Sequence, residues 1–282
     1  MKKIFAVLLA AAMLLSLCAC AQKNDVTVKE EVKESAVITT GLIDNIFDFN
    51  VYLEHRKEKH NDIAMIPEYL TYPNLSTAML ALEKGEVGML SLSKSTADYL
   101  LARNDKFKLM DFALDEDEVV FNKISMLTTD ANTEIYELLD SGIKQLKADG
   151  TLDKLIEEEL KAYITSDPTP EKLPKFDGAK TYRIAITGDK PPMDFVTADG
   201  KAAGFNVALL SEIANIAQVN FEIVQIDSGA RLTALATDTV DAVFWVVSAN
   251  CPYCDEVIET APEGTLITED YFTDDVAFLT LK

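Results

Sequence analysis

Between Tyr182 and Asn250 the chain alternates short apolar runs with stretches of helical spacing. In the longest helical stretch, apolar residues recur in steps of three, which marks one face of a helix. The predicted order is strand, helix, strand, helix, strand, at residues 182–187, 205–217, 221–226, from 228, and 240–247. Strands in this order build a parallel sheet, because parallel neighbours need crossovers and the helices supply them.

Ligands of such open sheets bind beyond the carboxyl ends of the strands. Residues 187–190, 227–231 and 246–250 therefore share one rim. Arg231 lies one turn into a helix, where amides and a cation favour an anionic group; a surface ion pair is the alternative. Trp245 is either a ligand platform or a core residue. The candidate ligand-binding residues of this rim are Asp189, Lys190, Asp194, Ser228, Arg231, Trp245 and Ser248. Asp189 and Asp194 face the cleft or are solvated turn carboxylates.

The N-terminal part of the chain repeats this order. We predict a strand over 36–40 that ends at Gly41, a helix from Leu42, and then strand, helix and strand at 62–67, 75–83 and 87–92. Thr39, Thr40 and Gly41 would form the equivalent rim, with backbone amides available to a polar ligand. Two halves of one pattern predict two α/β lobes, although so short a pattern also recurs by chance.

The two halves are joined by a strand at 122–128, helices at 133–147 and 152–163, and a proline-rich stretch at 165–180 that breaks regular structure. We therefore expect an α/β domain over 36–121, a crossing strand and closing helices over 122–164, a linker over 165–180, and a second α/β domain over 181–282. The alternative is two independently folded, truncated halves.

The first 20 residues have the pattern of an export signal. Lys2 and Lys3 precede an apolar stretch, 4–17, which is too short to span a bilayer comfortably. Leu17-Cys18-Ala19-Cys20 then resembles the lipobox of bacterial lipoproteins, which implies lipidation of Cys20 and a membrane anchor. Ordinary signal cleavage with a spare cysteine is the alternative. Polar residues 21–35 predict a tether.

Composition and charge limit the classes of ligand. With 48% hydrophobic residues in 282, the chain can bury a proper core. Its 26 basic and 47 acidic residues give a net charge of −21, which disfavours nucleic acid and anionic lipid headgroups as ligands.

Cys251-Pro-Tyr-Cys254 matches the active-site motif of glutaredoxins and precedes a possible helix at 255–260. In an exported protein this spacing more often closes a local disulfide, so a structural bond and a redox pair are both considered. A metal site is disfavoured because no further Cys or His lies nearby. No cofactor is indicated.

Several short motifs resemble the extracellular solute-binding proteins of ABC transporters, in the group that typically binds amino acids. In the C-terminal half these are Asp189-Lys-Pro-Pro192, Asp199-Gly200 with Gly204-Phe-Asn206, and Ala234-Leu235 with Val240-Asp241; Thr268 to Thr273 resembles the segment leading to the hinge. The first half is similar to the family's second lobe through Leu75 to Leu82 and Gly85-Glu-Val87, and Tyr136 to Leu160 to its closing helices. The resemblance implies a two-lobed, periplasmic-binding-protein-like α/β fold.

The order of the parts departs from the family, which runs first lobe, second lobe, closing helices. This chain runs second lobe, closing helices, first lobe, which predicts a circular permutant cut at the hinge. Three site positions depart as well. No arginine follows Arg231 to clamp a ligand carboxylate, the ammonium-binding acid falls at about Ser93, and the stacking aromatic falls at Lys190. Ligand identity therefore stays open.

Three classes of function follow. The first is a lipid-anchored receptor that closes over a small polar solute and presents it to a membrane permease, without chemistry. The second is an enzyme on the same scaffold, similar to the related dehydratases, for which Asp189, Asp194 and Asp227 are the candidate acids or bases. The third is a thiol oxidoreductase acting through Cys251 and Cys254.

Overall fold

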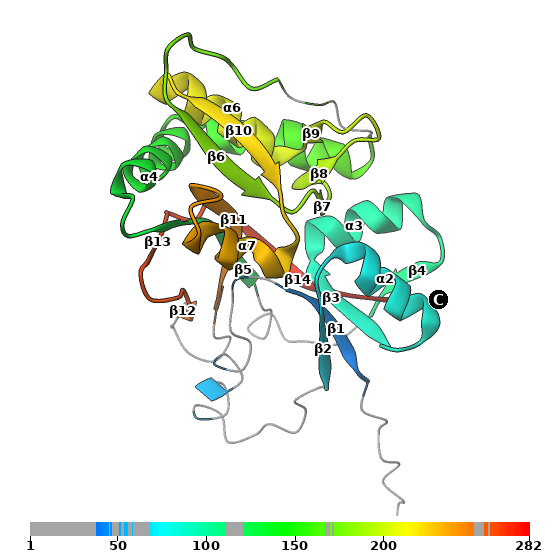
Figure 1. Cartoon of the computed structure of the whole chain (residues 1–282). Coiled ribbons are helices and arrows are strands. Elements are labelled where there is room, and N and C mark those ends of the chain that lie inside the picture. The colour runs from blue at the N-terminus through cyan, green and yellow to red at the C-terminus, as the bar shows by residue number, and fades with distance from the viewer. Residues whose placement is uncertain are drawn as a thin grey trace, which may run out of the picture. The chain divides into compact units, whose positions relative to one another are not determined.

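The structure is a computed structural model that describes residues 38–44, 46, 51, 54–55, 58, 68–110, 121–166, 170, 172–250, 257–258 and 260–282 (Figure 1). Within these residues an 11-stranded sheet runs in the order β10-β6-β11-β5-β14-β3-β1-β2, with β12, β13 and β4 attached to β11, β5 and β14. Its strands are β1 (Thr40–Ile43), β2 (Tyr69–Tyr72), β3 (Met89–Ser93), β4 (Phe107–Leu109), β5 (Phe121–Thr129), β6 (Thr181–Ile186), β10 (Asn220–Gln225), β11 (Ala242–Asn250), β12 (Val257–Ile258), β13 (Thr265–Ile267) and β14 (Phe272–Leu281). A small separate sheet holds β7 (Asp189–Lys190), β8 (Asp194–Val196) and β9 (Ala202–Ala203).

The helices pack against the strands of the large sheet (Figure 1). Those of the described residues are α2 (Leu75–Lys84), α3 (Lys94–Arg103), α4 (Thr133–Asp149), α5 (Thr151–Leu155), η2 (Ile156–Lys161), η3 (Ala162–Ile164), α6 (Phe205–Ala217), η4 (Ser228–Ala230) and α7 (Arg231–Ala236). None of them is long and apolar enough to cross a membrane.

The sheet divides into two halves with separate cores. In the β1 half, strands β1 to β4 pack with α2 and α3 around Leu82, Leu90 and Phe107. In the β6 half, strands β5, β6, β10 and β11 pack with α4 to α7 in two clusters, around Ile184 and Phe205 and around Val243 and Ile46. Strand β14 pairs with β5 on one side and with β3 on the other, so it joins the halves.

The predicted α/β class with two parallel-rich halves is confirmed. Strand β1 pairs in parallel with β2 and β3, and β6 pairs in parallel with β10 and β11. Where the halves meet the pairing is antiparallel: β5 pairs with β11 and with β14, and β14 pairs with β3. Gly204 lets α6 begin close to the β7–β8 turn, since it has φ 104° and a Cβ there would lie 2.6 Å from the Met193 carbonyl oxygen.

Helix α4 packs on the β6 half. Its buried face, formed by Ile135, Leu139, Ile143 and Leu146, belongs to the same cluster as Ile184 and Leu210. Gly142 allows Ile213 of α6 to approach, because a Cβ at Gly142 would lie 3.0 Å from the Ile213 side chain. The described residues between 165 and 180 contain neither helix nor strand.

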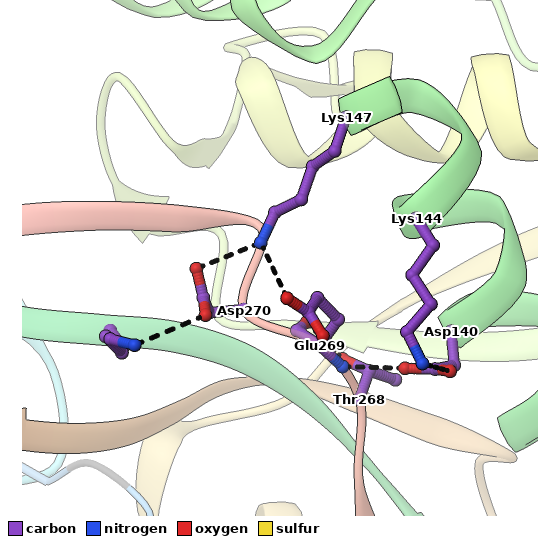
Figure 2. A network of polar contacts seen from close by, with 7 residues as sticks. Asp140, Lys144, Lys147, Thr268, Glu269 and Asp270 are labelled. Atoms are coloured by element: carbon purple, nitrogen blue, oxygen red, sulfur yellow. Dashed lines mark hydrogen bonds and ion pairs between the residues drawn. The ribbon is translucent and has the colours of Figure 1, made fainter. Parts of the chain in front are cut away.

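Polar contacts fix α4 to the segment that leads into β14 (Figure 2). The Glu269 backbone amide donates to Asp140 Oδ1 at 2.8 Å, and Lys144 Nζ lies 2.7 Å from Asp140 Oδ2. Lys147 Nζ lies 3.2 Å from carboxylate oxygens of both Glu269 and Asp270. These exposed pairs contribute little stability each, but together they orient the chain where it turns into the joining strand.

Three predicted elements need correction, and one helix was not predicted. The first strand does not end at Gly41 but runs to Ile43, so the helix predicted from Leu42 does not begin there. Residues 257–258, predicted as helix, form β12. Helix α3 was not predicted; its local N-cap Ser93 makes no side-chain cap bond, and Asp274 of β14 supplies one instead, accepting from the Ser95 amide at 3.1 Å. The predicted strand at 62–67 lies outside the described residues.

Candidate functional site

Asp194 lies at the centre of the predicted rim and is completely buried. Its Oδ1 accepts from Thr187 Oγ1 at 2.9 Å and from the Gly188 amide at 2.7 Å. Its Oδ2 accepts from Asn206 Nδ2 at 2.9 Å and from the indole N–H of Trp245. Four donors occupy its lone pairs, so both readings of Asp194, as a cleft residue or a solvated turn carboxylate, are wrong.

Trp245 is a core residue whose side chain contacts two polar groups. It is 2% exposed and sits where the pairing of β11 with β5 shifts between Val243 and Val246. Its φ of 70° places it in the left-handed region, which a bulky residue adopts only when its surroundings hold it there. The hydrogen bond to Asp194 and the ring's contact with a lysine provide that hold.

Lys190 is that lysine. Its ammonium lies 4.3 Å from the centre of the Trp245 ring, and the residue is 4% exposed. Burial, followed by repulsion from Arg231, lowers the pKa of Lys190 to about 7. Asp194, Asp189 and Asp44 act in the opposite direction. The position at which the family resemblance places a stacking aromatic therefore holds a buried cation.

Arg231 is buried completely and is bound by backbone carbonyls rather than by a carboxylate. Its Nε donates to the Ser228 oxygen at 3.0 Å, Nη1 to the Phe244 and Trp245 oxygens at 2.7 and 3.2 Å, and Nη2 to the Asp44 oxygen at 3.0 Å. Burial lowers the pKa of Arg231 to about 10. The sequence suggested two interpretations of Arg231, a rim cation that binds an anionic ligand and a surface ion pair. Its complete burial contradicts both.

Ile46, which was predicted to belong to a helix, instead forms an isolated parallel bridge with Val246 in the middle of β11. The Ile46 amide donates to the Trp245 oxygen at 3.3 Å, and the Val247 amide donates to the Ile46 oxygen at 3.4 Å. The Ile46 side chain is buried in the cluster around Val243. Asp44 approaches closely because residue 229 is glycine: a Cβ there would lie 3.1 Å from Asp44 Oδ2.

Asp189 links the β6 half to the first turn of α2. Its Oδ2 accepts from the Leu75 amide at 2.6 Å, and its buried Oδ1 has no hydrogen-bond partner. Burial raises the pKa of Asp189, against the effects of the Leu75 amide, of Lys190 and of the nearby Thr187 hydroxyl, whose hydrogen bond goes to Asp194. Ser228 also contacts the β1 half, because its amide donates to the Pro73 oxygen at 3.3 Å, and its buried Oγ has no hydrogen-bond partner. We call this boundary between the two halves the seam.

The remaining predicted site residues do not lie together in one place. Thr39 precedes β1, and Thr40 and Gly41 are its first residues, so they do not lie at its carboxyl end. A Cβ on Gly41 would lie 2.6 Å from Leu90, which places it over the core of the β1 half rather than on a rim. Ser93 does end β3, and buried Ser248 pairs with Lys123 inside the sheet. The predicted rim of the β1 half is thus wrong, and Asp44, after Ile43, takes its place.

Three cysteines with predicted roles, Cys20, Cys251 and Cys254, lie outside the described residues. Among the described residues no group of three or more His, Cys, Asp or Glu side chains is arranged to hold a metal ion. Asp227, a candidate acid or base, is exposed and accepts the Ala230 amide through its carbonyl oxygen at 2.9 Å.

The seam therefore brings together two cations, Lys190 and Arg231, with the carboxylates of Asp44, Asp189 and Asp194. Most of their hydrogen-bonding capacity is spent inside the protein. Asp189 Oδ1 and Ser228 Oγ are two buried acceptors of this seam without a partner. An arrangement of this kind can bind a polar group, and it holds the two halves together.

Comparison with known proteins finds a family match over part of the chain. Residues 182–258 match the family model of bacterial extracellular solute-binding proteins, family 3. No curated protein matches. Solved structures with similar folds include the GluR0 ligand-binding core complexed with L-glutamate (13% identity, 88% of this chain and 86% of that one, TM-score 0.37). A periplasmic substrate-binding protein of an ABC transporter from Coxiella burnetii is similar at 15% identity (86% and 84%, TM-score 0.37).

The aliphatic sulphonate-binding protein SsuA from Escherichia coli is similar at 10% identity, with 87% of this chain aligned and a TM-score of 0.36. The chain spans only 61% of that protein's length. At such TM-scores none of these structures supports an inference about ligand. The matched segment runs from β6 to β12 and contains Asp189, Lys190, Asp194, Arg231 and Trp245. The resemblance to extracellular solute-binding proteins is thereby confirmed over residues 182–258.

Proposed function

We propose that this protein is an extracytoplasmic receptor that binds a small polar solute, an amino acid or a related compound, for an ABC importer. The observation that carries the proposal is the family match over residues 182–258, which spans the strands and the turn that form the seam. Two halves with separate cores, joined through β5 and β14, are consistent with hinge closure around a solute. No catalysis is proposed.

The chain is, in this proposal, a circular permutant of the family. Support comes from the order of the sheet, in which β5, early in the chain, lies between β11 and β14. Support also comes from α4, which packs in the core of the β6 half although 31 residues separate its end from β6. A chain whose original ends lay in the β6 half could be joined through residues 165–180 and opened elsewhere.

Solute recognition is assigned to the polar atoms at the seam. Asp189 and Ser228 have buried oxygens without partners, and Ser93 lies at the carboxyl end of β3. Lys190 and Trp245 form the adjoining wall. Arg231 and Asp194 support this wall rather than bind the solute, because internal partners use their hydrogen bonds.

Membrane attachment is assigned to a lipid on Cys20, which would hold the receptor near its permease. Mass spectrometry of the mature N-terminus tests this part separately, with Cys20→Ser as the comparison. An unmodified N-terminus after cleavage elsewhere would contradict the anchor without affecting solute binding.

Thermal-shift screening of the purified protein against amino acids, short peptides and organic acids tests the receptor proposal. A solute that binds the folded state stabilises it by mass action and so raises the melting temperature. At a solute concentration a hundredfold above the Kd the free energy of unfolding increases by about 2.7 kcal/mol. Binding that survives Cys251→Ser with Cys254→Ser excludes a thiol-dependent function. If no compound shifts the wild type, the receptor proposal loses its support.

A further inference from the structure

The contact between Asp189 and α2 crosses from one half of the molecule to the other. Asp189 belongs to β7, next to the β6 half, and the Leu75 amide that it accepts at 2.6 Å is the first N–H of α2 in the β1 half. The first turn of α2 carries no acidic residue, and Asn74 caps it only through the Thr77 amide, at 2.9 Å. The Asp189 carboxyl group is therefore the partner that α2 finds for its first N–H.

The contact is incompletely satisfied when Asp189 is ionised. Oδ1 is buried and has no partner, and a buried charge without hydrogen bonds is costly. The charged groups that face Asp189 are Lys190 beside it on β7, Asp194 on β8 and Arg231 on α7. The two cations attract the carboxylate and Asp194 repels it. Burial outweighs the other effects and raises the pKa of Asp189.

We propose that Asp189 and the first turn of α2 form an acid-strengthened latch between the two halves. The protonated carboxyl group still accepts a hydrogen bond from the Leu75 amide through Oδ2. Because this group is neutral, its burial removes no charge from water. The ionised group keeps that hydrogen bond but gains from exposure to water, so the latch opens more readily as the pH rises. The direction follows from linkage: the closed state binds the proton more tightly than the open state.

The experiment is amide hydrogen exchange at Leu75, followed by NMR between pH 4 and 6 and corrected for the intrinsic exchange rate. Lys190, whose pKa is about 7, stays largely protonated in this range, so its titration does not obscure the result. In the wild type the protection factor of Leu75 should fall with rising pH, by at most tenfold per pH unit because one proton is involved. In Asp189→Asn, which keeps the acceptor oxygen without the charge, protection should stay constant.

Asp274→Asn is the matched control, because Asp274 is also a buried carboxylate on a helix N-terminus, accepting the Ser95 amide and the Ser95 hydroxyl, the latter at 2.6 Å. It should leave the pH profile at Leu75 unchanged. The core amide of Leu210 should not follow the Leu75 profile, which separates local opening from global unfolding. A wild-type protection factor at Leu75 that stays constant or rises with pH overturns the latch. This outcome is measured on the wild type alone, so it does not depend on whether a variant folds. An Asp189→Asn profile with the wild-type slope also overturns it.

Discussion

The indole N–H of Trp245 donates to Asp194 Oδ2, a contact between residues 51 positions apart that joins β11, where its pairing with β5 shifts, to the first residue of β8. Both residues are almost fully buried, so this hydrogen bond has no competition from water. It fixes the only tryptophan of the sequence next to Lys190, which makes Trp245 fluorescence a direct probe of the seam.

Replacing Asp194 by Ala should destabilise the protein by roughly 3–5 kcal/mol, because four buried donors lose their acceptor together. Urea unfolding followed by Trp245 fluorescence measures the change. Asp199→Ala removes an exposed carboxylate three residues beyond the β8 strand, paired with Lys201 at 2.6 Å, and should leave the midpoint unchanged. Equal effects of the two substitutions would contradict the central role of Asp194.

The stability of the wild type should rise with pH between about 7 and 10.5. Burial lowers the folded-state pKa of Lys190 to about 7, whereas the unfolded chain retains the ordinary value of 10.5, so the unfolded state binds more protons in this range. The slope for one such group is at most about 1.4 kcal/mol per pH unit. Urea midpoints measured across this range test the sign.

Lys190→Met should flatten that rise, because the titrating group is gone. Lys201→Met, at an exposed lysine, should retain the wild-type slope. Retention of the full slope in Lys190→Met would mean that another group releases the proton on folding.

Arg231→Lys should cost roughly 2–4 kcal/mol although the charge is kept. An ammonium group lacks the planar fork that reaches the carbonyl oxygens of Ser228, Phe244 and Asp44 at once, and the oxygens left over are buried. Arg183→Lys is the comparison, since Arg183 is partly exposed and donates to the Asp238 oxygen at 2.6 Å; it should change the free energy of unfolding by less than about 0.5 kcal/mol. Equal costs would show that Arg231 acts only as a charge.

Ile46→Ala should destabilise the protein by about 2–4 kcal/mol, because the side chain is buried among Leu127, Val243 and Val246 of the β6 half. Ile216→Ala, at a position that is 37% exposed, should have a much smaller effect. Chemical denaturation of both variants checks the difference. A neutral Ile46→Ala substitution would show that the Ile46 side chain does not contribute to the cluster around Val243.

Local patterning was sufficient for the regular elements whose core face has a clear period. Helix α6 occupies the predicted residues 205–217, and α4 begins at the predicted Thr133. Strand β10 and the buried run at β11 were also predicted within a few residues, because periodicity reflects burial on one face. The resemblance to solute-binding proteins was visible for the same reason, since its motifs are local.

The site depended on the tertiary structure. Whether Arg231 meets solvent or the Asp44 carbonyl, 187 residues away, cannot be deduced from either neighbourhood in the sequence. The Ser95 amide of α3 is capped by Asp274, 179 residues away in the sequence, whereas the local N-cap residue Ser93 makes no side-chain cap bond, so this contact could not be deduced from the local sequence. The sequence alone determined which residues can form strands, helices and charged turns. Only packing decided which charges lose their water, because burial and hydrogen-bond partners come from segments that are distant along the chain.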